Sequence, residues 1–214
     1  MHHTQSPDAY YDRCLPHIQP AGATFFITYR LAGSIPIKLL KQWKEVLDEA
    51  KRRGKGKPDA LATTYRRQFL LMDRYLDKDA NGPYWLSKPF ISKEVANSLH
   101  HLNEKRYRLW AYCIMPNHVH VLLTHQDTKW PLYKILQSHK SYTAKICNRL
   151  LERSGPFWEK EYYDHIVRNP SAFSNILNYI LQNPVKAGLT RNWKEWPYTW
   201  CCETLLKLNL IFST

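Results

Sequence analysis

The sequence lacks any long apolar run, since no stretch approaches the roughly 18 to 20 apolar residues that a membrane-spanning helix needs. The first residues are polar and do not form the apolar core of a secretory signal peptide. Internal repeats and low-complexity segments are also missing. A chain of 214 residues with these features predicts one folded domain in the cytoplasm, without a membrane anchor.

A disulfide or zinc-finger framework is missing too. The cysteines are odd in number and widely scattered, and no two of them form a C-x-x-C pair: Cys14, Cys113, Cys147, Cys201 and Cys202. Cys14 and His17 make an isolated C-x-x-H pair with no partner nearby in the sequence. We therefore expect reduced thiols without a zinc role.

Acidic residues are scarce relative to basic ones. Eighteen Asp and Glu residues stand against 31 Lys and Arg residues, which gives a formal net charge of +13. An excess of this size indicates a polyanionic partner, and without membrane-type segments that partner is nucleic acid. A basic surface that serves only solubility is the alternative interpretation.

The most informative segment is MPNHVHVLL, residues 115–123. In a strand, residues i and i+2 point to the same face, so His118 and His120 are expected side by side with Val119 on the opposite face. Two imidazoles on a rigid sheet provide half of a metal site. Without further evidence, the pair is either a set of metal ligands or two ordinary half-buried histidines.

Hydrophobic periodicity predicts helices packed on an antiparallel sheet, an α+β domain. Residues 1–22 are expected to be irregular, and Ser92 is expected to cap a helix that reaches Asn103. The predicted strands are 23–31, 106–115, 118–124 and 162–168. The predicted helices begin near 36, 59, 92, 132 and 170.

The helix that begins at Asn169-Pro170 has an apolar stripe from Phe173 to Leu181. Tyr179 and Asn183 are four residues apart on one flank of that stripe, so both can reach a site between helix and sheet. Pro184 disfavours helical continuation at Asn183.

These residues suggest phosphodiester chemistry. A metal held by His118, His120 and the Asn183 amide oxygen keeps its full positive charge, which suits Lewis-acid polarisation of a phosphate. Mg²⁺ or Mn²⁺ fits a site completed by oxygen ligands, although imidazoles also accept Zn²⁺. A nearby phenolate could attack phosphorus. Spacing alone does not choose Tyr179 from the fourteen tyrosines.

Four segments resemble one known family. MPNHVHVLL resembles the histidine–hydrophobic–histidine (HUH) motif of single-tyrosine transposases, and NYILQNPVKAGL, preceded by YYDHIVRN, resembles the tyrosine helix of the REP-associated tyrosine transposases. GATFFITYRLAGSIP and SYTAKICNRLL are similar to the same group. The segments occur in the family's order, and the resemblance extends from about residue 14 to Tyr198.

The resemblance implies a ferredoxin-like or RRM-like antiparallel sheet with helices packed on one face. It implies His118, His120 and Asn183 as metal ligands and Tyr179 as the nucleophile. The implied reaction is cleavage and joining of single-stranded DNA at REP-type hairpins, with Mg²⁺ or Mn²⁺, through a 5′-phosphotyrosine. A helical insertion at about 34–103 separates the first strand from the histidine strand, so this part of the chain is longer than in compact members of the family.

Two alternatives remain open at this level: a hairpin-binding protein without chemistry, and a metal-dependent nuclease that uses water. The resemblance allows a monomer or a homodimer, and it implies a bacterial protein of the cytoplasm associated with the nucleoid. Candidate phosphate contacts near the motifs are Lys140, Arg168 and Lys186.

Overall fold

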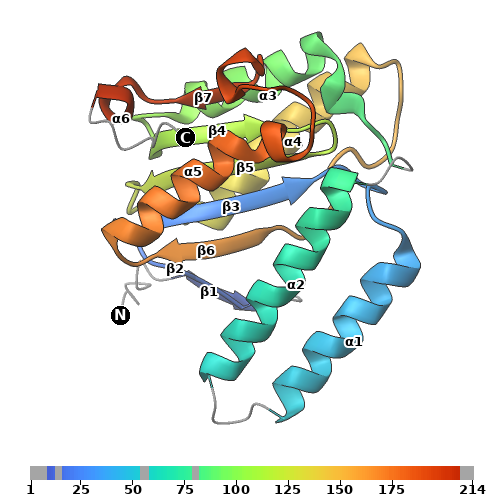
Figure 1. Ribbon diagram of the computed structural model, residues 1–214, viewed down its shortest axis with the longest axis vertical. Helices are drawn as coiled ribbons and strands as arrows, with labels where there is room; N and C mark the ends of the chain where they lie inside the picture. Colours follow the sequence, from blue (N-terminus) through green and yellow to red (C-terminus); the bar gives the residue numbers. More distant parts are fainter. Residues whose placement is uncertain (1–8, 13–15, 54–57, 79–81, 208–214) are drawn as a thin grey trace, which may run out of the picture.

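The structure is a computed structural model that describes residues 9–12, 16–53, 58–78 and 82–207. At its centre is a five-stranded sheet in the order β6-β3-β5-β4-β7, with every neighbouring pair of strands antiparallel (Figure 1). The strands are β3 (Thr24–Arg30), β4 (Tyr107–Ile114), β5 (His118–His125), β6 (Tyr163–Val167) and β7 (Thr199–Cys201). The predicted α+β class with an antiparallel sheet is confirmed.

Helices cover both faces of this sheet. The helices α3 (Pro89–Leu102) and α4 (Leu132–Leu150) lie behind it in Figure 1, and α5 (Pro170–Lys186) crosses in front. The expectation that helices pack on one face is therefore corrected. The central strand β5 is buried on both faces, and its sequence pattern did not distinguish a covered face from an open one.

Each face has its own hydrophobic cluster. Val119, Val121 and Leu123 of β5 belong to the cluster that includes α3 and α4. Leu122 points the other way and belongs to the cluster that includes Leu177 of α5. Since His118 and His120 alternate with the valines, they point to the α5 side, as the strand pattern predicts.

A β-bulge in β4 interrupts the alternation of side chains between the two faces of that strand. The pairing register with β5 shifts between Leu109 and Ala111, so Trp110 is the extra residue. Leu109 and Tyr112 consequently belong to one cluster, while Trp110 packs against the other. Strict alternation would have placed Trp110 and Tyr112 on the same face.

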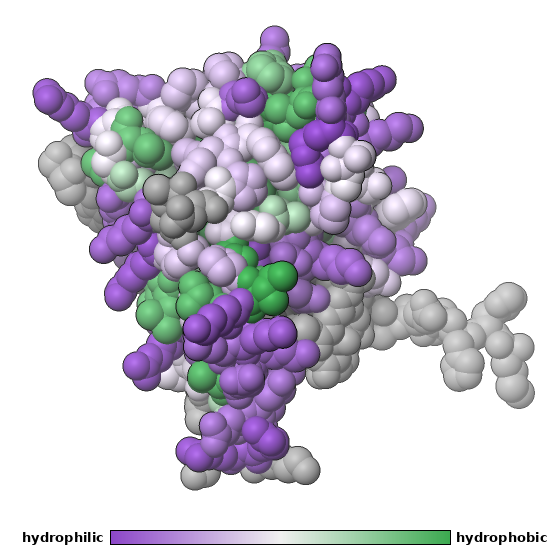
Figure 2. Space-filling view, turned by 90° about the vertical axis from the view of Figure 1, so that its right-hand side faces the viewer, coloured by the Kyte–Doolittle hydropathy of each residue, from purple (hydrophilic) through white to green (hydrophobic). Residues whose placement is uncertain are grey.

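The helices α1 (Ile37–Arg53) and α2 (Pro58–Lys78) form a hairpin that projects beyond the sheet (Figure 1). No described residue of α1 is buried, and hydrophilic side chains cover much of the projecting part (Figure 2). The predicted insertion at 34–103 also contains α3, whose side chains are part of the core. The division of the chain at these positions stays a prediction.

Two further expectations about element boundaries are corrected. Residues 9–12 and 16–19 are not irregular, since β1 (Ala9–Asp12) pairs with β2 (Pro16–Gln19). Ser92 is not a helix cap: it lies inside α3, and its hydroxyl donates to the Leu86 carbonyl. A proline at the first turn, Pro89, starts that helix.

Helix α5 begins at Asn169-Pro170 as predicted, and Asn169 caps it, because its side chain accepts a hydrogen bond from the Ala172 amide. The helix nevertheless continues through Pro184 to Lys186, which corrects the expected end near Asn183. Burial of Asn183 and Pro184 in the packed helix outweighs the local preference of the residue before proline.

The short elements η1 (Trp85–Ser87), η2 (Trp193–Glu195) and α6 (Glu203–Lys207) complete the fold. Among the described helices, none is long and apolar enough to cross a membrane. The described cysteines are free thiols, as expected, and Cys14 lies outside the described residues.

Candidate active site

The two histidines of β5 form a close, fully buried pair. Their Nε2 atoms face each other at 2.9 Å, and both side chains are 0% exposed. The ring of His120 also stacks on Phe26, with ring centres 5.7 Å apart. The predicted side-by-side arrangement is present, and water is largely excluded from it.

Neighbouring side chains orient both rings. Asn117 donates from Nδ2 to the Leu76 carbonyl at 3.0 Å, which turns its Oδ1 toward Nδ1 of His118 at 2.6 Å. An amide oxygen only accepts, so Nδ1 of His118 carries the proton and Nε2 keeps a lone pair. Thr28 contacts Nδ1 of His120 at 2.7 Å and can accept its proton in the same way.

Both histidines are neutral at pH 7. Burial lowers the pKa of His118 to about 3, with a further contribution from His120. Burial also lowers the pKa of His120 to about 3, assisted by the charge of Lys186. Two neutral rings that direct lone pairs at one another across 2.9 Å repel, whereas a cation between them satisfies both.

Helix α2 adds two carboxylates that the sequence analysis missed. Asp73 Oδ1 lies 3.4 Å from Nε2 of His120, and Asp77 Oδ1 lies 3.9 Å from Nε2 of His118. Both Oδ1 atoms are buried without a hydrogen-bond partner in the described structure. Their four-residue spacing on a predicted helix was visible, but nothing in the sequence linked that helix to the histidines.

The two carboxylates share a poorly solvated space. Burial and, to a smaller extent, the charge of Asp73 raise the pKa of Asp77 to about 7. Burial also raises the pKa of Asp73, against the opposing effects of His118 and a hydrogen bond from Tyr179. This environment favours an additional positive charge.

Tyr179 reaches the same space from α5. Its hydroxyl donates to Oδ2 of Asp73, and its ring meets that of His120 edge to face at 5.6 Å. Lys186 Nζ lies 4.6 Å from the centre of the same ring. Burial and the charge of Asp73 raise the pKa of Tyr179, so the phenol is protonated.

Asn183 is fully buried one helical turn beyond Tyr179. It lies close enough to lower the pKa of that phenol. Neither its Oδ1 nor its Nδ2 meets a partner in hydrogen-bonding geometry among the described residues. A buried amide without partners is costly, so this side chain fits a ligand that the protein itself does not supply.

The residues therefore fit a divalent metal ion. Asp73, His118 and His120 each offer one ligand atom, and these atoms lie within 4.8 Å of one another. Two ligands at about 2.1 Å from one ion and at right angles are about 3.0 Å apart, close to the 2.9 Å observed between the imidazoles. A cavity of about 600 Å³ adjoins them, lined by residues that include Asp73, Tyr179 and Asn183.

The three candidate phosphate contacts occupy different positions. Lys186 lines the cavity beside Tyr179. Lys140 is engaged elsewhere, because its Nζ donates to the carbonyls of Glu159 and Lys160 at 2.6 and 3.0 Å. Arg168 is exposed after the end of β6.

Comparison with known proteins agrees with this geometry. Residues 84–183 match the family model described as IS200-like transposase. A Haemophilus influenzae protein provisionally named a REP-associated tyrosine transposase is 31% identical over 99 residues, 42% of this chain and 56% of that protein. The REP-associated tyrosine transposase of Escherichia coli K12 is 22% identical over 98 residues, 45% of this chain and 55% of that protein. The chain thus spans about half the length of these curated relatives.

A solved structure of a REP-associated tyrosine transposase bound to a REP hairpin has the same fold. The match has a TM-score of 0.53 at 14% identity, and it covers 89% of this chain and 81% of the other. The matched family segment contains His118, His120, Tyr179 and Asn183. Residues 84–183 are therefore similar to the IS200-like transposases, and over about 100 residues the chain is similar to REP-associated tyrosine transposases.

Proposed function

We propose that this protein cuts and rejoins single-stranded DNA at REP-type hairpins through a covalent phosphotyrosine. The observation that carries the proposal is a cavity lined by Tyr179 and the buried amide of Asn183, with two facing imidazoles directly behind the tyrosine ring. The bound hairpin in the related structure and the net charge of +13 support a DNA substrate.

The residues have distinct roles in this proposal. His118, His120 and Asn183 would hold Mg²⁺ or Mn²⁺, which when bound supplies Lewis-acid polarisation of the scissile phosphate. The oxygen of Tyr179 attacks phosphorus, the bond to the 3′ oxygen breaks, and a 5′-phosphotyrosine forms with a free 3′-OH. Asp73 accepts the proton of the phenol, to which it is hydrogen-bonded. The leaving 3′ oxygen takes up one proton and becomes the free 3′-OH, so the step is balanced in protons. The reverse attack by a 3′-OH rejoins the strand.

The test is a denaturing gel of hairpin DNA incubated with the protein and Mg²⁺ or Mn²⁺. We expect a protein–DNA adduct that Tyr179→Phe abolishes, because the variant lacks the attacking oxygen. Tyr142→Phe is the matched control, since Tyr142 is 55% exposed on α4 and does not line the cavity.

Other outcomes identify the two alternatives. Hairpin binding without cleavage in the unaltered protein would indicate a non-catalytic binding protein. Cleavage that persists in Tyr179→Phe would indicate a nuclease that uses water. Whether the protein acts as a monomer or as a homodimer stays a prediction.

A further inference from the structure

The first inference concerns helix α2, which places two carboxylates at the histidine pair. The helix belongs to the projecting hairpin, but its C-terminal end reaches the sheet (Figure 1). Asp73 and Asp77, in the last two turns, lie beside the histidines there. Leu76, between them, is 3% exposed, and its carbonyl accepts from Asn117 at the start of β5. The end of α2 is therefore fixed to the strand that carries the histidines.

The two oxygens of Asp73 have different surroundings. Oδ2 accepts from the Tyr179 hydroxyl, whereas Oδ1 is buried without a partner and lies 3.4 Å from Nε2 of His120. A buried carboxylate oxygen without a partner is destabilising unless a cation compensates it. The separation of 3.4 Å suits two ligands on adjacent positions of one ion.

We propose that Asp73 is a metal ligand through Oδ1 and that it positions the Tyr179 phenol through Oδ2, with Asp77 as an outer carboxylate. This inference rests on the proposed function, because it concerns the same metal and the same tyrosine. The projecting hairpin thereby completes the active site. It also changes the electrostatics expected from the sequence, since one bound carboxylate reduces the net charge of the metal centre from +2 to +1.

The test measures Mn²⁺ binding by calorimetry without DNA, so it does not depend on cleavage. Asp73→Asn keeps the side-chain shape but removes the charge. We expect it to weaken Mn²⁺ binding by about 10- to 100-fold. Asp77→Asn should have a smaller effect. The control is Glu45→Gln on α1, a residue exposed to solvent that lines neither the cavity beside the histidines nor the pocket next to α1.

Circular dichroism of each variant establishes that it folds. If Asp73→Asn folds and binds Mn²⁺ as tightly as the unaltered protein, Asp73 is no ligand, and the inference is wrong while the proposed function stands. If His118→Ala also leaves Mn²⁺ affinity unchanged, the metal site of the proposed function is itself wrong.

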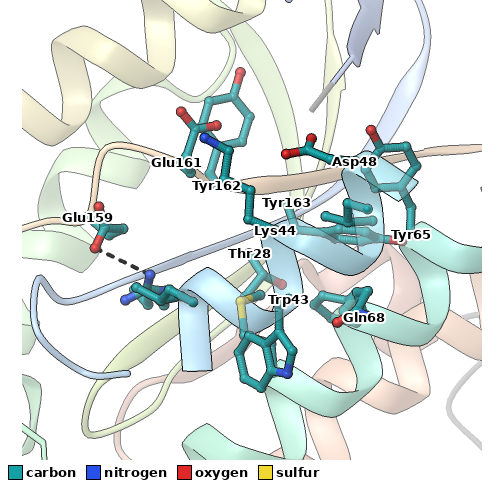
Figure 3. Close-up of a pocket in the computed structure, with 15 residues that line it drawn as sticks. Thr28, Trp43, Lys44, Asp48, Tyr65, Gln68, Glu159, Glu161, Tyr162 and Tyr163 are labelled. Atoms are coloured by element: carbon teal, nitrogen blue, oxygen red, sulfur yellow. Dashed lines mark ion pairs between the residues drawn. The ribbon is translucent and has the colours of Figure 1, made fainter. Parts of the chain in front are cut away.

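A second inference comes from a separate pocket of about 240 Å³ between the helical hairpin and the edge of the sheet (Figure 3). Trp43 comes from α1, Phe69 from α2 and Tyr163 from β6, so aromatic side chains from three elements meet there. Phe69 and Tyr163 stack with ring centres 4.0 Å apart. The volume suits one flat ring system rather than a longer ligand.

Polar side chains also line this pocket. Thr28 forms part of its wall and also contacts Nδ1 of His120 at 2.7 Å, so the pocket is one side chain away from the candidate metal site. Gln68 lines the pocket, and its buried Oε1 has no hydrogen-bond partner in the described structure. Arg30 also lines the pocket, and it forms an ion pair with Glu159 at 3.2 Å, the dashed line in Figure 3.

We infer that this pocket binds one unpaired nucleobase of the DNA strand, a base with an exocyclic amine such as adenine or cytosine. Aromatic walls bind any base by stacking. An amide oxygen without a partner can accept a hydrogen bond from the exocyclic amine of adenine or cytosine, whereas thymine has no exocyclic amine and offers only its ring N3–H. The inference deepens the proposed function by naming what the strand presents beside the metal site.

The test uses fluorescein-labelled dA10, dC10 and dT10 in anisotropy titrations without metal, in the Tyr179→Phe background. Trp43→Ala should weaken binding of all three by about 5- to 150-fold, because stacking contributes about 1–3 kcal/mol per base. Gln68→Leu should remove the preference for dA10 and dC10 over dT10. Trp130→Ala is the control: Trp130 is 44% exposed and lies against Arg106, outside this pocket.

The outcomes separate this inference from the proposed function. If Trp43→Ala binds every strand as the parent does, or if the parent shows no preference among bases, the base pocket is refuted while single-strand binding stands. If the parent binds none of the strands, the DNA substrate of the proposed function is in question as well.

Discussion

At the scale of single residues, the state of the two active-site histidines depends on the side chains that contact their Nδ1 atoms. Asn117 and Thr28 each occupy one ring nitrogen and leave the other nitrogen directed at its counterpart. The carbonyl of Leu76 fixes the orientation of the Asn117 amide in turn. The pair is therefore preorganised for a cation before any ligand arrives.

His139 offers a test of the buried-histidine electrostatics away from the site. It bonds to Tyr29 Oη and Ser98 Oγ, each at 2.8 Å, and burial lowers its pKa to about 3. Between pH 6.5 and 3 the unfolded chain protonates this residue and the folded chain does not. Because of this histidine, the free energy of unfolding should decrease as the pH is lowered from 6.5 to 3, by up to about 1.4 kcal/mol per pH unit.

The measurement is urea unfolding at several pH values for the unaltered protein and His139→Gln. Asp77 shifts in the opposite direction, since its raised pKa adds stability as the pH falls below about 7. The comparison between the two proteins removes that contribution. Equal pH slopes would mean that His139 titrates normally in the folded state.

At the scale of elements, helix periodicity and cap chemistry determined where α5 lies in the sequence and which stripe it buries. The boundaries that failed share a cause. Pro184 is tolerated inside α5, and Ser92 lies inside α3, because tertiary packing outweighs the local preferences. These preferences are about 3 kcal/mol against a proline in a helix interior and about 1 kcal/mol for a serine cap. The bulge at Trp110 follows the same logic, since cross-strand pairing rather than alternation sets its face.

At the scale of the whole molecule, the net charge of +13 does not show which basic side chains can contact DNA, because this depends on where the fold places each of them. Lys186 lines the active-site cavity, whereas Lys140 is engaged with backbone carbonyls of the loop before β6. The two lysines, equal in charge, therefore differ in the role that the fold assigns them.

This difference predicts distinct responses in hairpin-binding titrations at several salt concentrations. Lys186→Ala should weaken binding and reduce the slope of log K against log salt by about one, as loss of a phosphate contact does. Lys140→Ala should leave that slope unchanged and instead lower the melting temperature, because its hydrogen bonds are internal. An unchanged slope in Lys186→Ala would exclude Lys186 as a phosphate contact.

The sequence by itself determined the antiparallel α+β fold, the shared face of His118 and His120, and the helix that carries Tyr179 and Asn183, because these follow from local periodicity. Only the tertiary structure decided that α2 brings Asp73 and Asp77 to the histidines and that Lys140 is engaged internally. These contacts join residues far apart in the chain, and the packing of helix against sheet, which no local pattern encodes, sets their distances.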